Sequence, residues 1–196
     1  MKPTDLSVMV VDENRLRASM IRDGLFAAGC REVTIVSDLK GLVAEIERTS
    51  PSVIVMDIES PDRDRLEDYF AVSRSVKKPI AMFVDKSDPS WMEAAIDAGV
   101  SSYVVDGLRP DRVKPILDMA IARFEAFRRM EQELERTKDE LSGRKLVDKA
   151  KGILMKSKGI SEQEAHQLLR NAAMNQNRKM SEVAQGLITA SGLLDL

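Results

Sequence analysis

Short apolar segments alternate with amphipathic segments along the first part of the chain. Five apolar runs have the composition of buried strands: LSVMVVD, EVTIVS, PSVIVMD, PIAMFVD and SSYVVDG. Each is followed by a segment of helical periodicity: NRLRASMIRDGLFAAG, DLKGLVAEIERT, DRLEDYFAVSRSV, SWMEAAIDAG and a helix that opens at Pro110. Strands that are apolar on both faces are typical of a parallel sheet covered by helices. We therefore predict an α/β fold, a doubly wound five-stranded parallel sheet, over residues 1–121.

The helix that opens at Pro110 is predicted to continue beyond the sheet domain as a stalk over residues 122–143. Its apolar residues recur at spacings of three and four, with weak positions at Arg123 and Thr137: Val113, Ile116, Ala120, Phe127, Met130, Leu134 and Leu141. Sustained heptads need a surface on which to bury their seam, so we favour a coiled-coil homodimer over a solvated single helix. Gly143, after Ser142, predicts a break or bend where the stalk ends.

The tail, residues 144–196, is predicted to form a small unit of three short helices. Their expected bounds are Lys145 to Lys158, Ser161 to about Met174, and Ser181 to about Ala190. In the segment SEQE, Ser161 is the expected N-cap and Glu164 reaches back to it. The alanines and leucines of the tail keep helical spacing, and most of them, Leu168 included, are expected to form the core of this unit.

Charge separates an acidic body from a mildly basic tail. The 196 residues carry a formal net charge of −2. Residues 145–196 hold eight lysines and arginines against five acidic residues, a net charge of +3, which leaves −5 for residues 1–144. A polyanion would therefore meet the tail. With Cys30 as the only cysteine and His166 as the only histidine, an internal disulfide is excluded and a zinc site lacks its soft ligands.

Several classes of protein are not expected from this sequence. No apolar run approaches the length that a bilayer crossing requires, and the start MKPTDLSVMVVDEN lacks the order of a secretory signal, so we expect a cytoplasmic protein that does not enter a membrane. Outside the carboxylates described next, no nucleophile and base lie at a usable spacing, and no glycine-rich phosphate loop is present. We therefore do not expect an enzyme.

Three carboxylates fall at the ends of predicted strands. Asp12 and Glu13 end the first strand in VVDEN, and Asp57 ends the third in VIVMDIESP. The first and third strands are neighbours in a doubly wound sheet, so these side chains are expected to converge on one crevice. Because clustered carboxylates repel one another, a hard cation such as Mg²⁺ is their usual relief. For any one of them, a helix N-cap or a solvated strand end is the alternative.

With a proline four residues beyond Asp57, at Pro61, this pattern resembles the response-regulator receiver domain, a flavodoxin-like fold, over residues 5 to about 121. The resemblance implies that Asp57 is the phosphoryl acceptor. It also implies that Mg²⁺ is held by Asp12, Glu13 and Asp57. The backbone carbonyl of Glu59 is implied as a further ligand.

Two positions depart from the receiver pattern. The family has Thr or Ser at the end of the fourth strand, where the hydroxyl holds the phosphoryl group, but this chain has Val84, followed by Asp85. The family's lysine at the end of the fifth strand is replaced by Asp106. A phosphoryl group adds nearly two negative charges, and neither group is present to hold it. We expect a degenerate receiver that is controlled by a partner protein, with a phosphorylation-switched two-component regulator as the alternative.

The tail strongly resembles the ANTAR domain, the RNA-binding module of transcription antitermination regulators, through AKGILM, SEQEA, LLRNAAM and NRKMSEVA. The resemblance implies binding to a two-hairpin element in nascent leader RNA, which prevents a terminator hairpin from forming. His166 stands where the family often has an aromatic residue, and an imidazole can also stack on a base. The candidate RNA-binding residues are Lys151, Arg170, Arg178 and Lys179, with Asn175 and Asn177 as secondary candidates.

Receiver, stalk and ANTAR segments in this order resemble the AmiR and NasT group of antiterminators, and PIAMFVDKSD and SSYVVDGL resemble its NasT branch. This implies control of nitrate or nitrite assimilation genes through a cytoplasmic sensor similar to periplasmic binding proteins. Two other classes stay open. A tail that binds duplex DNA is disfavoured, because SEQEAHQLLRNAAM offers mostly acids at its N-terminal end. A protein-interaction module without nucleic-acid binding is distinguished by the salt dependence of binding.

Overall fold

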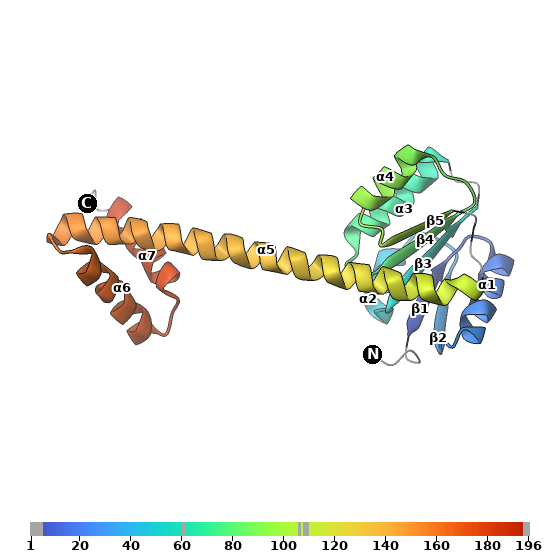
Figure 1. Ribbon diagram of the computed structural model, residues 1–196, viewed down its shortest axis with the longest axis horizontal. Coiled ribbons are helices and arrows are strands. Elements are labelled where there is room, and N and C mark those ends of the chain that lie inside the picture. Colours follow the sequence, from blue (N-terminus) through green and yellow to red (C-terminus); the bar gives the residue numbers. More distant parts are fainter. Residues whose placement is uncertain (1–5, 60–61, 106, 108–109, 194–196) are drawn as a thin grey trace. The chain divides into compact units, whose positions relative to one another are not determined.

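A computed structural model of the protein describes residues 6–59, 62–105, 107 and 110–193 (Figure 1). The chain divides into two compact units, Met1–Arg128 and Arg129–Leu196. Within the described ranges, no helix combines the length and the apolar character that crossing a membrane requires.

The first unit contains a five-stranded parallel sheet. Its strands are β1 (Ser7–Val11), β2 (Glu32–Val36), β3 (Val53–Ile58), β4 (Ile80–Val84) and β5 (Ser102–Val105). The helices are α1 (Arg15–Ala27), α2 (Leu42–Thr49), α3 (Arg63–Ser75), α4 (Pro89–Asp97) and the start of α5 (Pro110–Lys158). The strand order is β2-β1-β3-β4-β5, and every pair is parallel. This is the order of a doubly wound sheet, so the predicted fold class is confirmed.

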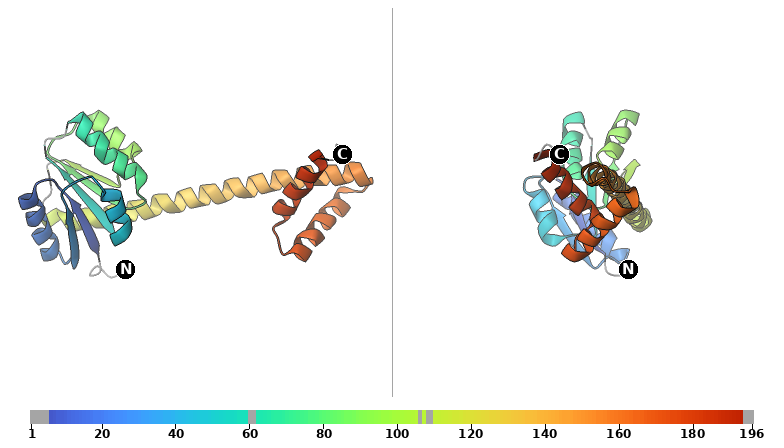
Figure 2. Two further views of the ribbon diagram at one scale, coloured as in Figure 1. Left: turned by 180° about the vertical axis from the view of Figure 1, so that it is seen from behind. Right: turned by 90° about the vertical axis from the view of Figure 1, so that its left-hand side faces the viewer.

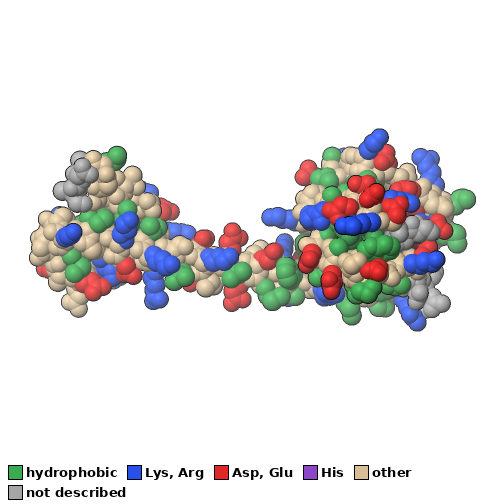
Figure 3. Space-filling view, turned by 90° about the horizontal axis from the view of Figure 1, so that it is seen from above, with side chains coloured by type: hydrophobic (Ala, Val, Ile, Leu, Met, Phe, Trp, Pro, Cys, Tyr) green, Lys and Arg blue, Asp and Glu red, His purple; other side chains and the backbone are tan. Residues whose placement is uncertain are grey.

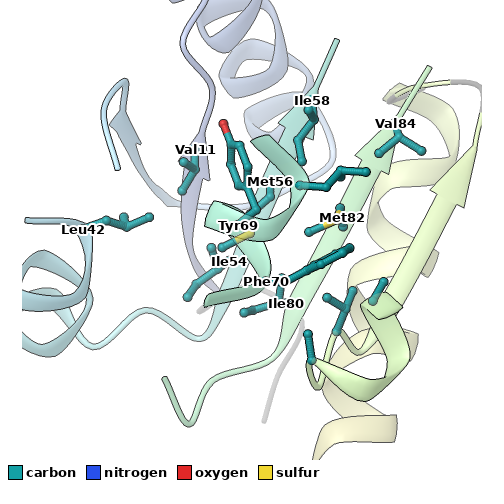
Figure 4. Packing of buried hydrophobic residues seen from close by; sticks show 14 of the residues in the cluster. Val11, Leu42, Ile54, Met56, Ile58, Tyr69, Phe70, Ile80, Met82 and Val84 are labelled. Atoms are coloured by element: carbon teal, nitrogen blue, oxygen red, sulfur yellow. The ribbon is translucent and has the colours of Figure 1, made fainter. Parts of the chain in front are cut away.

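Helices cover both faces of the sheet (Figure 2). Two apolar layers, one on each face, hold this unit together. Helices α2, α3 and α4 contribute to one layer, in which Met56 and Tyr69 are buried (Figure 4). Helix α1 and the first turns of α5 contribute to the other, which contains Val55 and Phe83. Neighbouring strand residues thus face opposite layers, as the pleat of a strand requires. Cys30 belongs to the second layer and is 4% exposed.

The carboxyl ends of β1 and β3 lie side by side. Val11 of β1 pairs with Met56 of β3, so Asp12, directly after β1, is next to Asp57. On the other side of β3, Val84 of β4 is opposite Ile58. This register brings the predicted acidic residues to the crevice at the carboxyl edge of the sheet, where open α/β sheets bind ligands.

Helix α5 runs without interruption from Pro110 to Lys158. The predicted break at Gly143 is therefore wrong, and the predicted helix from Lys145 to Lys158 is the end of α5. A glycine in a helix interior costs only about 0.5–1 kcal/mol relative to alanine, and packing accounts for this one. A Cβ at position 143 would lie 3.3 Å from the Cβ of Ser181. Gly143 thus marks the close approach of two helices.

Helices α6 (Glu162–Gln176) and α7 (Met180–Leu193) complete the second unit, beside the end of α5 (Figure 1). The predicted capping box opens α6: the Glu164 amide donates to the Ser161 hydroxyl, and the Ser161 amide donates to the Glu164 carboxylate. Leu168, a predicted core residue, is 42% exposed because it lies beside the buried stripe of α6. The buried core is small: Ala150, Leu154, Ala165, Leu169 and Ala184.

Candidate functional sites: an acidic pocket and a basic cleft

The loop after β1 brings an arginine to the acidic crevice. The backbone amide of Asn14 donates to Oδ1 of Asp12 at 2.8 Å. The Asn14 side chain in turn caps α1, because it accepts from the backbone amides of Leu16 and Arg17. These short-range contacts fix the start of α1 relative to β1. Arg17 consequently stands in the first turn of α1, within reach of the ends of β1 and β3.

The guanidinium of Arg17 contacts three carboxylates. It is bidentate to Asp12, with Nε 2.8 Å from Oδ2 and Nη2 2.9 Å from Oδ1. Nε is also 3.1 Å from Oδ2 of Asp57, and Nη1 donates to Oε2 of Glu59 at 2.8 Å. The Asp12 side chain is fully buried, whereas that of Arg17 is 26% exposed. A planar guanidinium suits this arrangement because its donors point in several fixed directions.

A second arginine binds the remaining predicted metal ligand. Nη2 of Arg65, in α3, lies 2.8 Å from Oε2 of Glu13. The side chains of the four predicted ligand residues are thus divided between two arginines. Among the described residues, no group of three or more His, Cys, Asp or Glu side chains is arranged to hold a metal ion. As folded, the carboxylates of this donor set do not fit a divalent cation, because both oxygens of Asp12 and one oxygen each of Asp57 and Glu13 already face arginines. The contact of Glu59 with Arg17 involves its side chain and not the backbone carbonyl that the resemblance implies as a ligand. Mg²⁺ at this pocket stays a prediction of the family resemblance.

Asp57 is the carboxylate of the pocket whose pKa is most clearly raised. The pKa of Asp57 is raised to about 6, and burial is the largest cause. The negative charges of Asp12, Asp85 and Glu59 also raise this pKa, while the positive charge of Arg17 lowers it. The pocket therefore gathers more negative charge than its own arginine neutralises.

The end of β4 departs from the receiver pattern in the structure as it does in the sequence. Val84 is fully buried in the first apolar layer (Figure 4), and Asp85 after it is exposed. The amide of Gly107 donates to the Val84 carbonyl at 3.2 Å. The end of β4 thus has an apolar side chain and a carboxylate where the family has a hydroxyl. Asp106 and Pro61 lie outside the described residues.

A cleft with a volume of about 610 Å³ opens on the second unit. Four predicted RNA-binding residues line it: Arg170, Asn177, Arg178 and Lys179. The rest of the lining is His166, Ala173, Met174 and Met180. Because His166, Arg170 and Met174 follow one another at spacings of four, they share one face of α6, and Asn177 follows the last residue of that helix. Cations, an amide and an imidazole therefore surround apolar side chains in a single hollow.

The turn between α6 and α7 shapes one end of the cleft. Asn177 ends α6 in the left-handed conformation, with φ of 50°, which asparagine tolerates better than most residues. The amide of Arg178 then donates to the carbonyl of Ala173 at 3.0 Å, which closes the helix end. The Arg178 side chain pairs with Glu182 at 3.1 Å. Asn177 is thus a helix-terminating residue as well as a cleft residue, a role that the sequence analysis missed.

Two predicted RNA-binding residues do not line the cleft. Lys151 lies between α5 and α6, where its ammonium is 2.7 Å from Asp148 and 2.7 Å from Glu162. These two hydrogen bonds raise the pKa of Lys151, and its side chain is only 14% exposed. Asn175 is exposed but is not part of the lining. Lys151 thus joins two helices, and its RNA role stays a prediction, as does that of Asn175.

The cations of the cleft differ in how they are neutralised. Arg178 has Glu182 as its partner, but Arg170 and Lys179 form no ion pair within the described part of the chain. His166 was noted in the sequence as a departure from an aromatic pattern and as a group that can stack on a base, but not as a neighbour of Arg170. Its spacing of four from Arg170 is the sequence signal that places both on one helix face. Two unpaired cations beside an imidazole make this hollow suited to an anion that carries flat rings.

The predicted stalk presents an apolar stripe on α5. Phe127 is 64% exposed, and the other three large side chains of the stripe are also more than half exposed: Met130, Leu134 and Leu141. Figure 3 shows hydrophobic side chains interleaved with charged ones along this helix. Apolar side chains at heptad spacing that lack a covering within their own chain are typical of a helix that pairs with another chain.

The family to which the sequence matches agrees with the fold. Residues 8–118 match the response regulator receiver domain, and residues 135–188 match the ANTAR domain. The protein belongs to the response regulators in which a receiver domain is combined with an ANTAR domain. This is a regulatory family, and both resemblances stated from the sequence motifs are confirmed.

One relative extends over most of the chain, and two others match part of it. Transcriptional regulatory protein PdtaR of Mycobacterium tuberculosis is 26% identical over 185 residues, which cover 94% of this chain and 90% of that protein. The nitrate regulatory protein of Klebsiella oxytoca is 36% identical over 80 residues, or 41% of this chain and 20% of that protein. The aliphatic amidase regulator of Pseudomonas aeruginosa is 27% identical over 109 residues, 56% of each.

Solved structures resemble the sheet fold of the first unit. Chemotaxis protein CheY4 of Vibrio cholerae has a TM-score of 0.51 and 22% identity, and covers 59% of this chain and 98% of its own. A response regulator receiver domain protein of Methanospirillum hungatei has a TM-score of 0.53 and 17% identity, and covers 62% and 98%. At these identities the likeness concerns the fold alone.

Proposed function

We propose that this protein is a transcription antitermination regulator that binds a two-hairpin element in nascent leader RNA. In this proposal residues 1–121 form a degenerate receiver domain, residues 122–143 a stalk, and residues 144–196 the RNA-binding domain. The supporting observation is the cleft, in which Arg170, Asn177, Arg178 and Lys179 come together from two helices and their connecting turn. Polar residues that the predicted core of the tail leaves over thus share one hollow with His166.

The chemistry of the cleft favours a base splayed out of an RNA loop. Loop bases are unstacked, so their edges and faces are available to side chains. Arg170 and Lys179 suit the phosphates on either side of such a base, because neither has an ion-pair partner in the described structure to be displaced. His166 and Met174 offer flat and apolar contacts to the base, and the Asn177 amide offers a donor and an acceptor to its edge.

The second partner in this proposal is another copy of the chain. In the heptad that places Phe127, Leu134 and Leu141 at a positions, Met130 and the weaker Thr137 fall at d. A solvent-exposed seam of this length is stabilised when two helices bury it against each other. A dimer would present two clefts to two loops, and the tether would raise the effective concentration for the second contact.

Charges beside the seam favour parallel helices in register. In a parallel coiled coil, the g position of one helix lies near the following e position of its partner. Here the g positions are Glu133 and Glu140, and the following e positions are Lys138 and Lys145. Both g-to-e′ pairs therefore join opposite charges, whereas an antiparallel arrangement would bring the two glutamate positions together.

Control of the protein is assigned in this proposal to a partner protein that docks on the receiver domain. Val84 in place of a hydroxyl and the arginine contacts of Asp12, Asp57 and Glu59 both argue against an ordinary phosphorylation switch. The resemblance to the NasT branch suggests a cytoplasmic sensor similar to periplasmic binding proteins. The name of the Klebsiella oxytoca relative, a nitrate regulatory protein, supports nitrate or nitrite assimilation genes as the target.

The test of RNA binding is a titration of the full-length protein against a leader RNA that carries two adjacent hairpins. The same RNA with one loop mutated and a duplex DNA of equal length serve as controls, each at two salt concentrations. We expect tight binding that needs both loops and weakens as salt rises, because phosphate contacts release counterions. Equal binding to all three ligands, or none, would refute the proposal and leave a protein-interaction module as the better account.

The test of control is a reporter gene placed behind such a leader in cells with and without inducer. Asp57→Asn cannot accept a phosphoryl group, so induction that stays within about twofold of wild type supports control by a partner. Loss of induction in this variant, with RNA affinity unchanged, would instead support the phosphorylation-switched regulator.

A further inference from the structure

The acidic pocket of the receiver domain contains its own cation. The guanidinium of Arg17 makes four contacts with carboxylate oxygens, at 2.8 to 3.1 Å, and they include both oxygens of Asp12. Two of the carboxylates that Arg17 contacts, those of Asp12 and Asp57, are ligands on which a divalent ion would depend. The raised pKa of Arg17, caused first by its hydrogen bond to Asp12, keeps the guanidinium charged.

A guanidinium and a divalent ion compete for this place. A small hard cation needs close contact with oxygen lone pairs, at about 2.0–2.1 Å for Mg²⁺. In the structure, both oxygens of Asp12 and one of Asp57 already accept hydrogen bonds or ion pairs from Arg17. A metal ion would also be repelled by the positive charge of the guanidinium. Metal binding therefore requires Arg17 to withdraw and to lose a bidentate contact with a buried carboxylate.

The start of α1 makes this withdrawal costly. Asn14 caps the helix through the amides of Leu16 and Arg17, and its own amide is held by Asp12. The carboxylate that binds the arginine side chain is thus the one that anchors the loop from which the arginine projects. Side chain and backbone of this segment support each other, so the arginine is preorganised for the pocket.

We propose that Arg17 is a built-in counter-ion that takes the place of a divalent metal ion in this receiver domain. The pocket is neutralised in part by the chain itself and does not depend on metal. This extends beyond RNA binding and rests on separate residues, so its failure would leave the proposed RNA function untouched. It also supplies a structural reason why a partner protein, and not a metal-dependent phosphoryl group, would set the state of this domain.

The test compares Mn²⁺ binding to the full-length protein and two variants, followed by electron paramagnetic resonance of the free ion. Arg17→Met removes the proposed counter-ion and keeps an unbranched side chain. Arg15→Met removes the same charge from the same turn of α1, at an exposed position without an ion pair among the described residues. We expect Arg17→Met to bind Mn²⁺ at least about tenfold more tightly than wild type, and Arg15→Met to stay within about twofold.

Two results would overturn the proposal. If wild type binds Mn²⁺ as tightly as Arg17→Met, the arginine does not exclude the metal. If Arg15→Met gains as much affinity as Arg17→Met, the effect is general electrostatics and not occupation of the pocket.

A second variant guards against a loss of folding in Arg17→Met. Arg17→Lys keeps the charge but replaces the planar fork by a point charge, which cannot be bidentate to Asp12 and also reach Glu59. We expect its Mn²⁺ affinity to lie between those of wild type and Arg17→Met, and Mn²⁺ to raise its melting temperature more than that of wild type. A folded Arg17→Lys variant with wild-type affinity and no thermal shift would count against the proposal.

Discussion

The acidic pocket and the basic cleft are both clusters of like charge, but they are neutralised in opposite ways. In the pocket, Asp12, Asp57 and Glu59 are all in contact with one arginine of the same chain. In the cleft, Arg170 and Lys179 have no ion-pair partner in the described structure. The pocket is partly closed by its own side chain, whereas the cleft is open to a partner of opposite charge.

The presence or absence of ion-pair partners within the chain indicates which cluster is the better candidate for a binding site. Like charges that have an internal partner gain little from a ligand, because the ligand must first displace that partner. Unpaired cations around a hollow lose little when an anion binds, and they release counterions from the nucleic acid. The family resemblance alone would direct attention to both clusters equally. The two clusters are distinguished by whether their charged side chains form ion pairs within the chain.

The strongest test of the comparison reverses the unpaired charges of the cleft. Arg170→Glu combined with Lys179→Glu is expected to weaken binding to the two-hairpin RNA by about a hundredfold or more, because two phosphate contacts become repulsive. Fluorescence anisotropy at fixed salt measures the affinity. Lys156→Glu with Lys158→Glu changes the charge equally at the end of α5, away from the lining. An equal loss in this control would mean that the cleft has no special role.

A second test concerns the packing that positions α7 beside α5. Gly143→Leu is expected to lower the free energy of unfolding of the second unit by about 1–3 kcal/mol, because the new side chain overlaps Ser181. Gly152 is a matched control in the same helix, since a Cβ there meets nothing within 4 Å. Gly152→Ala should raise stability by about 0.5–1 kcal/mol. Urea unfolding followed by circular dichroism measures both, and equal effects would refute the close approach.

A third test uses the unfavourable ionisation of the pocket. The pKa of Asp57 in the folded state, about 6, lies above its ordinary value of 3.8. The folded state therefore binds the proton of Asp57 more tightly than the unfolded state does. The protein consequently loses stability as pH rises from about 4 to 6. Asp57→Asn is therefore expected to raise the free energy of unfolding by about 1–2 kcal/mol at pH 7.5 and to leave it unchanged near pH 4. Unfolding in metal-free buffer measures the difference, with Asp97→Asn as the control, because Asp97 is exposed and is not among the charges that shift the pKa of Asp57. A gain that is the same at both pH values would contradict this account.

The smallest expected effect concerns the exposed charges beside the apolar stripe of the stalk. Lys138→Glu should weaken the proposed dimer by roughly 0.2–1 kcal/mol for each of its two symmetric pairs. Adding Glu133→Lys to this variant should restore wild-type affinity, which sedimentation equilibrium measures. Asp139→Lys, on the outer face of the heptad, should have no effect. A dimer that is unchanged by Lys138→Glu would argue against the parallel register.

The sheet domain could be predicted from sequence because its signals are local and consistent. Apolar runs and amphipathic segments alternate, and each strand and helix of the first unit was found at the place expected. An error fell at Gly143 in the second unit, where a local rule of helix breaking was applied to a residue whose role is tertiary. Only the neighbour on α7, Ser181, reveals why a glycine is needed there.

The candidate sites were predictable to a lesser extent, for a physical reason. Carboxylates at strand ends are visible in the sequence because strand order brings them together, and Asp12 and Asp57 do meet. Arg17 was missed, since nothing in a lone arginine of an amphipathic helix shows which way its long side chain turns. Lys151 had the composition of a nucleic-acid contact, but its two carboxylate partners come from different helices. Pairing is a property of the fold and not of the local pattern.

Cys30, buried in the second apolar layer, has a practical consequence for spectroscopy. It is the only cysteine of the chain, it is 4% exposed, and burial raises the pKa of its thiol. The thiolate is the nucleophile that attacks thiol reagents, so Cys30 should react slowly in the native protein. A cysteine introduced on the stalk or at the rim of the cleft would then take up a spin label or fluorophore selectively. Distances between the labelled copies of the proposed dimer would then be measurable without first removing a native thiol.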